Sequence, residues 1–248
     1  MDRVLLVTGG SRGIGAATAL TAAAQGWAVA VNYTHNSLAA DEVVRDIRNA
    51  GGNAITVQAD VADEPQVLAM FQKIDAKLGR ITGLVNSAGV VDVAARVDEM
   101  SLARWQRMFA INAQGTFLCA REAVRRMSTK HGGQGGAIVN ISSVASTLGS
   151  AGQYVDYAAS KAAVDVFTLG LAREVATEGI RVNGVRPGLI DTEIHASGGQ
   201  PDRAHRLAAT IPMQRPGTAQ EIANAVVWLL SDASSYATGA MLDVTGGR

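Results

Sequence analysis

Two residues of the segment 154–175 have types and a spacing suited to proton transfer. Tyr157 and Lys161 are four positions apart, so a helix would place both side chains on one face. A free tyrosine titrates near pH ~10, and a close ammonium group favours the phenolate, which would give a proton donor and acceptor for work near neutral pH. Tyrosine and lysine also occur at this spacing by chance on exposed helices. On its own, the pair therefore favours two exposed side chains without a catalytic role. Whether it belongs to an active site depends on the motifs in the rest of the chain.

The elements that would position this pair alternate between strand and helix along the chain. Short apolar runs predict strands at 3–8, 27–33, 53–58, 84–86, 137–141, 181–185 and 240–244. Helical spacing of apolar residues predicts helices at 14–25, 37–50, 64–78, 101–127, 154–175 and 219–230. This alternation predicts an α/β fold in which a doubly wound parallel sheet (Rossmann fold) of about seven strands has helices on both faces. We expect a single domain over residues 1–248, with ligands bound beyond the carboxyl ends of the strands.

The segment 189–217 breaks this regular pattern. It holds two adjacent glycines and three prolines, with a short helical stretch at 204–209. A long irregular insertion at the carboxyl end of a strand is often a lid or a binding loop. We expect a substrate lid, and a merely tolerated surface insertion is an equally weighted alternative.

Composition and charge exclude several classes of partner. Lysine plus arginine and aspartate plus glutamate both number 22, and no long basic run occurs, which argues against nucleic acid and anionic membranes. Cys119 is the only cysteine, so an intrachain disulfide is impossible and a reducing compartment is expected. No stretch has the pattern of a secretory signal or a membrane span. The sequence thus predicts a cytoplasmic protein without membrane contact, and we expect no metal site.

A glycine-rich turn follows the first predicted strand and opens the first predicted helix. Such glycines allow a tight turn and let backbone N–H groups approach a pyrophosphate at the helix N-terminus. The spacing Gly-x-x-x-Gly-x-Gly differs from the general G-x-G-x-x-G fingerprint, but its place in the chain indicates a dinucleotide site. The residues of the turn expected to bind the cofactor are Gly9, Ser11, Arg12, Gly13, Ile14 and Gly15.

The end of the second predicted strand bears on which dinucleotide binds. NAD-selective sites place a carboxylate on the adenosine ribose about 20 residues after the glycines, whereas this chain has Asn32, Tyr33 and Thr34 there. Arg12 lies near a helix N-terminus, where a cation opposes the helix dipole, and this suggests an anionic ligand such as a ribose 2′-phosphate. A solvated surface arginine is the alternative. We expect NADP(H) to be preferred, with NAD(H) as the second candidate cofactor.

Six motifs in order now carry a resemblance to a known family. They are TGGSRGIG at 8–15, NSAG at 86–89, the asparagine of INAQGTF, ISS at 141–143, YAASK at 157–161 and RPG at 186–188. Together they resemble the short-chain dehydrogenase/reductase family along essentially the whole chain. The resemblance is strongest to the branch with 3-oxoacyl-carrier-protein reductases and bacterial glucose dehydrogenases, and it does not choose between them.

The resemblance implies a role for each polar residue of these motifs. Tyr157 would be the general acid/base, and Lys161 would favour its phenolate and bind the nicotinamide ribose. Ser143 would hydrogen-bond the substrate oxygen where charge develops. Asn112 would hold a water between Lys161 and solvent, although a helix-interior asparagine bonding locally is the default interpretation. The remaining residues that the resemblance places at the cofactor are Asp60, Val61, Asn86, Ala88, Gly89, Pro187, Gly188, Ile190 and Thr192.

Some of these positions have simpler explanations. Asp60 could equally cap the helix that follows it. The residues 86–89 could form an ordinary turn after a strand, and Pro187 with Gly188 is first of all a turn signal.

The serine assignment depends on a spacing that departs from the family pattern. The family usually has twelve residues between the catalytic serine and tyrosine, whereas thirteen separate Ser143 from Tyr157. We choose Ser143 over Ser142 because it is the second serine of the ISS motif. We place the extra residue in a bulge around 152–156, where the substrate should bind.

The expected reaction is the interconversion of a small-molecule carbonyl compound and a secondary alcohol. The alternatives are a sugar dehydrogenase and a dinucleotide-binding regulator without catalysis. The presence of all four residues with a catalytic role in the family pattern argues against the regulator: Asn112, Ser143, Tyr157 and Lys161. The cations of the segment 189–217 are offset by its carboxylates, so the sequence does not reveal whether an acyl-carrier-protein thioester is used. A homotetramer is expected by resemblance alone.

Overall fold

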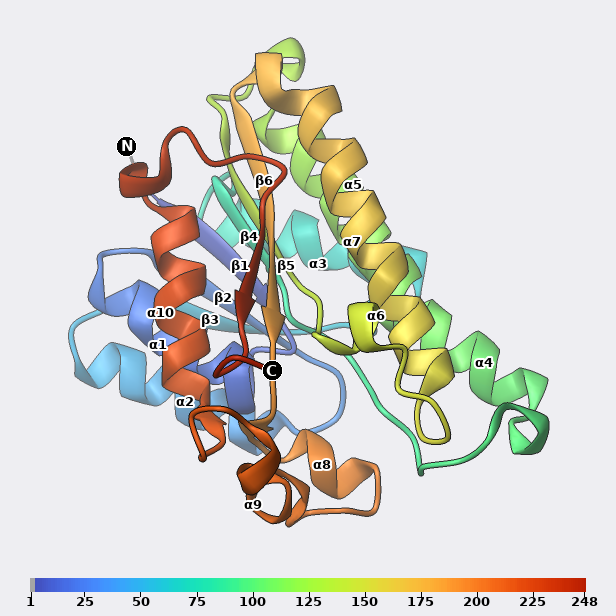
Figure 1. Cartoon of the computed structure of the whole chain (residues 1–248). Coiled ribbons are helices and arrows are strands. Elements are labelled where there is room, and N and C mark those ends of the chain that lie inside the picture. The colour runs from blue at the N-terminus through green and yellow to red at the C-terminus, as the bar shows by residue number, and fades with distance from the viewer. Residues whose placement is uncertain (1–2) are drawn as a thin grey trace.

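A seven-stranded parallel sheet forms the centre of the molecule in the computed structural model, which describes residues 3–248 (Figure 1). Its strands are β1 (Val4–Thr8), β2 (Ala28–Tyr33), β3 (Ala54–Gln58), β4 (Gly83–Asn86), β5 (Gly136–Ile141), β6 (Ile180–Pro187) and β9 (Met241–Val244). They lie in the order β3-β2-β1-β4-β5-β6-β9, and every neighbouring pair is parallel. The predicted doubly wound α/β fold is confirmed.

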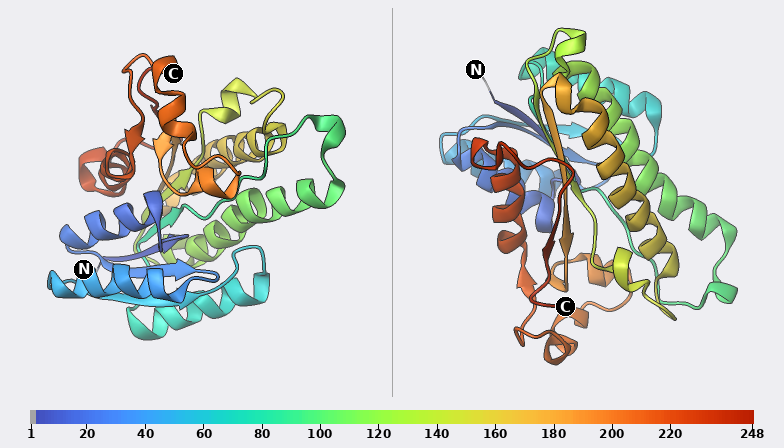
Figure 2. Two further views of the ribbon diagram at one scale, coloured as in Figure 1. Left: turned by 90° about the horizontal axis from the view of Figure 1, so that it is seen from below. Right: turned by 45° about the horizontal axis from the view of Figure 1, so that its top comes forward.

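Helices cover both faces of this sheet, as Figure 2 shows. One face packs against α1 (Gly13–Ala24), α2 (Ser37–Asn49) and α10 (Ala219–Leu230). The other packs against α3 (Glu64–Lys77), α5 (Gly115–Met127) and α7 (Val155–Val175). The shorter helices are α4 (Leu102–Phe109), α6 (Ala145–Leu148), α8 (Ile194–Ser197) and α9 (Arg203–Arg206), and 3-10 turns span Val97–Glu99, Thr129–His131, Ala176–Glu178, Ala208–Thr210 and Asp232–Ser234.

The apolar runs in the sequence form central strands because both faces of the sheet are covered. All five residues of β1 are buried. Leu5 and Val7 pack toward α1 and α10, whereas Val4 and Leu6 pack toward α3 and α5, as the alternation of side chains along a strand requires. The helices begin where the sequence supplies caps: Asp63 accepts from the N–H of Gln66 at the start of α3, and Thr218 forms a capping box with Glu221 at α10.

The strand order reverses between β1 and β4, and this places the polar strand ends together. Thr8 pairs with Asn86 across β1 and β4, and Asn86 pairs with Asn140 across β4 and β5. In open parallel sheets, ligands bind beyond the carboxyl ends of the strands at such a reversal. The segments that follow β1, β4 and β5 are therefore the ones that build a site.

Two regions differ from their sequence-based predictions. The single helix predicted at 101–127 is divided into α4 and α5 by a π-helical turn over Ala110–Gln114. The segment 189–217 contains a small parallel pair, β7 (Ile190–Asp191) with β8 (Gly217–Thr218), which joins its two ends. Figure 1 shows α8 and α9 of this segment below the carboxyl ends of the central strands. Within residues 3–248, no helix is both long and apolar enough to span a membrane.

Candidate active site

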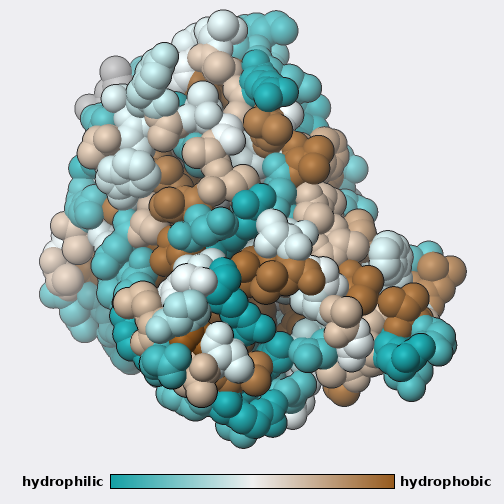
Figure 3. All heavy atoms as spheres, in the orientation of Figure 1, coloured by the Kyte–Doolittle hydropathy of each residue, from teal (hydrophilic) through white to brown (hydrophobic). Residues whose placement is uncertain are grey.

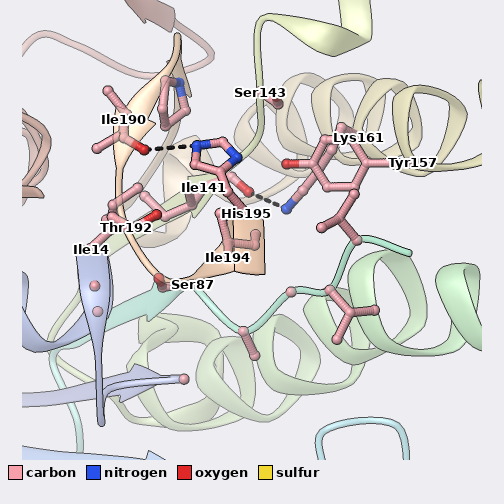
Figure 4. A pocket seen from close by; sticks show the side chains of 18 of the residues that line it. Ile14, Ser87, Ile141, Ser143, Tyr157, Lys161, Ile190, Thr192, Ile194 and His195 are labelled. Atoms are coloured by element: carbon pink, nitrogen blue, oxygen red, sulfur yellow. Dashed lines mark hydrogen bonds between the residues drawn. The ribbon is translucent and has the colours of Figure 1, made fainter. Parts of the chain in front are cut away.

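A cavity of about 600 Å³ opens at the carboxyl ends of the central strands. It is lined by the turn after β1, the ends of β2 and β3, the segments after β4 and β5, the first turns of α7, and residues 187–190 and 192–195. Figure 4 shows how Tyr157, Lys161 and Ser143 point into this space from α7 and the segment after β5, with His195 opposite them. The cavity thus combines a glycine-rich turn with hydroxyl, ammonium and imidazole side chains.

The glycine turn has a shape that side chains would obstruct. Gly9 has a φ of +60°, and a Cβ atom there would lie 2.9 Å from the Cα of Ala88. A Cβ on Gly15 would lie 2.2 Å from the carbonyl oxygen of Gly9. Thr8 joins this turn to the turn after β4, because its hydroxyl oxygen accepts from the backbone N–H groups of Ser87 at 3.0 Å and Ala88 at 3.1 Å.

The N-terminus of α1 opens toward the cavity without a capping side chain. Arg12 is the N-cap residue, and within the described chain no side-chain hydrogen bond caps this end. Arg12 is exposed and makes no ion pair with any of residues 3–248, although it lines the cavity. Free backbone N–H groups together with a cation provide a site for an anionic group such as a pyrophosphate.

Most residues predicted from the sequence to bind the cofactor or substrate line this one cavity. They are Gly9, Ser11, Arg12, Gly13, Ile14, Gly15, Tyr33, Thr34, Asp60, Val61, Ala88, Gly89, Ser143, Tyr157, Lys161, Pro187, Gly188, Ile190 and Thr192. Three predicted residues do not line it: Asn32, Asn86 and Asn112.

Asn32 supports the glycine turn instead of facing the cavity. Its side chain is buried; Oδ1 accepts from the N–H of Gly9 at 3.2 Å, and Nδ2 donates to the carbonyl of Ala59 at 3.0 Å. Asn86 is likewise buried and donates to Oδ1 of Asn140 at 2.9 Å, which joins β4 to β5. These two buried side chains thus support the loops that line the cavity, and their predicted contact with the cofactor remains a prediction.

Asp60 lines the cavity and is not the cap of α3. Its Oδ1 accepts from the N–H of Ala62 at 2.9 Å, which holds the turn after β3, while Asp63 caps the helix. The alternative explanation for Asp60, that of a helix cap, is thus wrong.

Tyr157 and Lys161 lie on the cavity side of α7 (Figure 4). The Lys161 ammonium lies 5.8 Å from the centre of the Tyr157 ring and donates to the carbonyl of Ile141 at 2.8 Å. Burial lowers the pKa of Lys161 to about 8, and Asp165 opposes this shift. Burial raises the pKa of Tyr157, and a hydrogen bond with the Ser143 hydroxyl opposes that rise. In the protein without ligand, the phenol is therefore protonated at neutral pH and is ready to donate.

The two neighbouring serines occupy different environments. Ser142 is 2% exposed, and its hydroxyl donates to the backbone carbonyl of Lys161 at 3.2 Å. The Ser143 oxygen accepts from the N–H of Ala145 at 3.1 Å and its hydroxyl contacts Tyr157 at the cavity wall. Only Ser143 has its hydroxyl next to the Tyr157 phenol, which agrees with the choice of Ser143 from the ISS motif.

Asn112 lies in the π-helical turn between α4 and α5 and is fully buried. Its Oδ1 accepts from the N–H of Val90 at 2.8 Å, and its Nδ2 donates to the Val90 carbonyl and to Ser160 Oγ, both at 3.0 Å. A Cβ on Gly89 would lie 3.4 Å from both Asn112 Oδ1 and Lys161 Nζ, so these two groups meet at Gly89. Asn112 therefore joins three parts of the site, beyond the local bonding that is its default interpretation. Its predicted role in holding a water remains a prediction.

The predicted 152–156 bulge spans the end of the loop between α6 and α7 and the first two residues of α7. The backbone has a positive φ at Gly149, Ser150 and Gly152, whereas 155 and 156 are already helical. The irregular backbone thus lies mainly upstream of the predicted 152–156 bulge. Ser150 and Tyr154 of this region line the cavity.

A buried ion pair fixes the start of α7. The carboxylate of Asp156 is fully buried and accepts from Arg104 of α4, at 2.8 Å from Nε and 3.2 Å from Nη2. This two-point contact joins α4 to the residue directly before Tyr157. The buried Arg104–Asp156 pair therefore fixes the first turn of α7 and with it the position of the Tyr157 side chain.

Three further residues that line the cavity, His195, Arg203 and His35, were not assigned to the site from the sequence, although Arg203 is one of the cations of the segment 189–217. His195 and Arg203 lie in the short helices α8 and α9, where four residues give no periodic pattern to detect. His35 directly follows Thr34 in the segment predicted to bind the ribose, and only this position in the sequence could have indicated that it lines the cavity.

Comparisons with known proteins agree with this geometry. The profile of the enoyl-(acyl carrier protein) reductase family matches residues 9–248. An uncharacterized oxidoreductase YgfF of Escherichia coli is 57% identical over 99% of both chains, and a 3-oxoacyl-[acyl-carrier-protein] reductase of Synechocystis is 42% identical over 99% of this chain and 96% of its own. A crystal structure of a dehydrogenase/reductase from Sinorhizobium meliloti superposes with a TM-score of 0.91 at 35% identity, covering 100% of this chain and 95% of the other.

Proposed function

Because this chain belongs to the short-chain dehydrogenase/reductase family and is an oxidoreductase of carbonyl and alcohol groups, we propose that it uses NADP(H), with Tyr157 as the general acid/base. One observation carries the proposal: the Tyr157 and Ser143 hydroxyls and the Lys161 ammonium share a cavity with an uncapped glycine turn. The turn and the helix N-terminus fit a pyrophosphate, and residues 187–190 and 192 line the same cavity as Tyr157. When bound, the nicotinamide supplies or takes the hydride.

The chain's own residues handle the proton and the substrate oxygen. In the reductive direction, the protonated phenol of Tyr157 donates to the carbonyl oxygen as it becomes an alcohol. The Ser143 hydroxyl donates to the same oxygen and stabilises its developing charge. The Lys161 ammonium stabilises the Tyr157 phenolate that remains after this proton transfer. Asn112 accepts from the Val90 N–H and so holds the turn at Gly89 beside the Lys161 ammonium.

The preference for NADP(H) rests on the charges at the end of β2. Residues 33–36 line the cavity and contain no carboxylate, while the exposed Arg12 borders the same region. A ribose 2′-phosphate would bind the free guanidinium, and no acid at this position would repel it. Asp60, an acid of the cavity in the turn after β3, already accepts from the N–H of Ala62 in that turn.

The test compares kcat/KM for NADPH and NADH in the wild type and in Arg12→Ala, with a panel of ketones as substrates. Loss of a charge-assisted hydrogen bond of about 1.5–3 kcal/mol should lower kcat/KM for NADPH by roughly 10-fold to 150-fold and change that for NADH little. Arg173→Ala, at the distant end of α7, is the matched control. A wild type that prefers NADH, or equal losses with both cofactors, contradicts the proposal.

The segment 189–217 is proposed to be the substrate lid. A Cβ on Gly13 would lie 3.4 Å from the side chain of Thr192 and 3.6 Å from that of Glu193, so this segment covers the glycine turn. Its α8 directs His195 into the cavity. Closure over a bound dinucleotide is the expected behaviour of such a segment.

A homotetramer is proposed from the apolar side chains that remain exposed. Val166 on α7 is 73% exposed and Leu102 on α4 is 70% exposed, and apolar residues gather over these helices in Figure 3. Light scattering coupled to gel filtration measures the mass of the assembly.

We propose a cytoplasmic location from the single cysteine, Cys119. It is buried as a free thiol, and burial raises its pKa to about 12.

A further inference from the structure

His195 projects from the lid segment into the cavity on the side opposite α7. Its Nε2 lies 2.9 Å from the carbonyl oxygen of Ile190, and its other ring nitrogen is directed toward the side that holds the Tyr157 hydroxyl (Figure 4). Both residues line the same cavity. His195 is therefore placed to meet a substrate bound at Tyr157.

The contact with Ile190 determines which ring nitrogen carries the hydrogen. A carbonyl oxygen can only accept, so Nε2 must be the protonated nitrogen, and Nδ1 of the neutral ring is an acceptor. Burial lowers the pKa of His195 and the Arg203 guanidinium lowers it further, while the Ile190 bond and Asp191 oppose this. The neutral ring thus predominates near pH 7, with an acceptor facing the cavity.

The polar groups around the reacting carbon have complementary roles. The hydroxyls of Ser143 and Tyr157 donate to the substrate carbonyl oxygen in the proposed reduction. An unsubstituted ketone has no hydrogen to donate to Nδ1 of His195, so its binding leaves this acceptor without a partner once water is displaced. A site built around such a group discriminates against substrates that lack the matching donor.

We propose that His195 determines specificity by accepting, at Nδ1, a hydrogen bond from a hydroxyl group beside the reacting carbon of the substrate. The preferred substrates are then hydroxyketones and the corresponding diols. The carbonyl carbon gains the hydride and its oxygen gains the proton from Tyr157, while the neighbouring hydroxyl is unchanged. This inference rests on the proposed function of the same site.

The test measures kcat/KM with NADPH for two matched pairs: acetoin with 2-butanone, and 2-hydroxycyclohexanone with cyclohexanone. The wild type should prefer each hydroxyketone by about tenfold or more, equivalent to ~1.4 kcal/mol. His195→Phe keeps the ring size and removes the acceptor, so the ratio should fall toward one. His195→Asn, whose amide oxygen can take the place of Nδ1, should restore part of the ratio. Ser197→Ala on the exposed side of α8 is the control and should leave the ratio unchanged.

The pH dependence gives a second readout that a purely structural role of His195 would not produce. Protonation converts Nδ1 from an acceptor to a charged donor, so the ratio of kcat/KM for the hydroxyketone to that for the ketone should change as the pH falls through the lowered pKa of His195, and His195→Phe should lose this change. Turnover of ketones with no preference, or a His195→Phe ratio equal to that of the wild type, overturns the inference but not the proposed function. Absence of turnover with all four ketones also overturns the inference, which requires turnover of hydroxyketones, and leaves the proposed function to the comparison of NADPH with NADH.

Discussion

Replacing Lys161 with methionine should make the cofactor-free protein more stable near neutral pH, although it removes a residue of the proposed site. The Lys161 side chain is 5% exposed, and its ammonium donates to the carbonyl of Ile141. Burial lowers its pKa from the ordinary 10.5 to about 8, with only partial compensation from Asp165. The folded protein therefore holds this charge at a cost in free energy.

The size and sign of the effect follow from linkage. The pKa difference between 10.5 and about 8 corresponds to roughly 3 kcal/mol, which destabilises the folded wild type below pH ~8. Methionine removes this cost but also the hydrogen bond to Ile141, worth about 1 kcal/mol. The variant should thus be more stable by about 2 kcal/mol at pH ~7. Between pH ~8 and ~10.5 the unfolded chain binds more protons than the folded one, so the wild type gains stability and the difference should vanish or reverse.

Guanidinium unfolding of both proteins at pH 7, 9 and 10.5, without cofactor, measures this difference. Lys77→Met, at the exposed end of α3, is the control and should show no such pH dependence. A Lys161→Met variant that is less stable than the wild type at pH 7 would refute this cost of burying the Lys161 charge. A stability difference between the two proteins that stays constant from pH 7 to 10.5 would refute it as well.

Two further substitutions test the geometry around Tyr157. Ser143→Ala should lower kcat by on the order of 100-fold and leave the Kd for NADPH nearly unchanged, because it removes a donor to the substrate oxygen; a larger loss in Ser142→Ala would reject the assignment of Ser143. Arg104→Met leaves the buried Asp156 carboxylate without its partner and should reduce the free energy of unfolding by about 3–5 kcal/mol. The double change Arg104→Met with Asp156→Leu should recover most of that loss in chemical denaturation, and a loss below about 1 kcal/mol in the single variant would contradict this account of the pair.

The sheet could be predicted from the sequence because its strands are buried on both faces. The run from Val4 to Val7 is apolar throughout and does not alternate between apolar and polar residues, which is typical of such a strand. The start of α10 could be predicted from its capping box, which Thr218 and Glu221 form. The π-helical turn at Ala110–Gln114 could not be predicted, since the apolar spacing continues through it. The pair β7–β8 has two residues in each strand, which is too short for a periodic pattern.

The candidate site was predictable where a motif fixes both residue type and element. Tyr157, Lys161 and Ser143 line one cavity because α7 and the segment after β5 bring them there. The side chain of Asn32 could not be placed in the same way: its position at the end of β2 suggested cofactor contact, whereas strand alternation turns it inward to Gly9. His195 had no sequence signal, because its position depends on the tertiary path of the lid segment.

The proposed acid/base role of Tyr157 is tested most directly by single-turnover reduction of a ketone in wild type and Tyr157→Phe with NADPH. Phenylalanine keeps the ring and removes only the hydroxyl at the cavity wall. The account predicts that the rate of NADPH oxidation falls by roughly 100-fold to 10,000-fold while the Kd for NADPH, measured by fluorescence, changes less than about threefold. A Tyr157→Phe variant that reduces the ketone at close to the wild-type rate would contradict it.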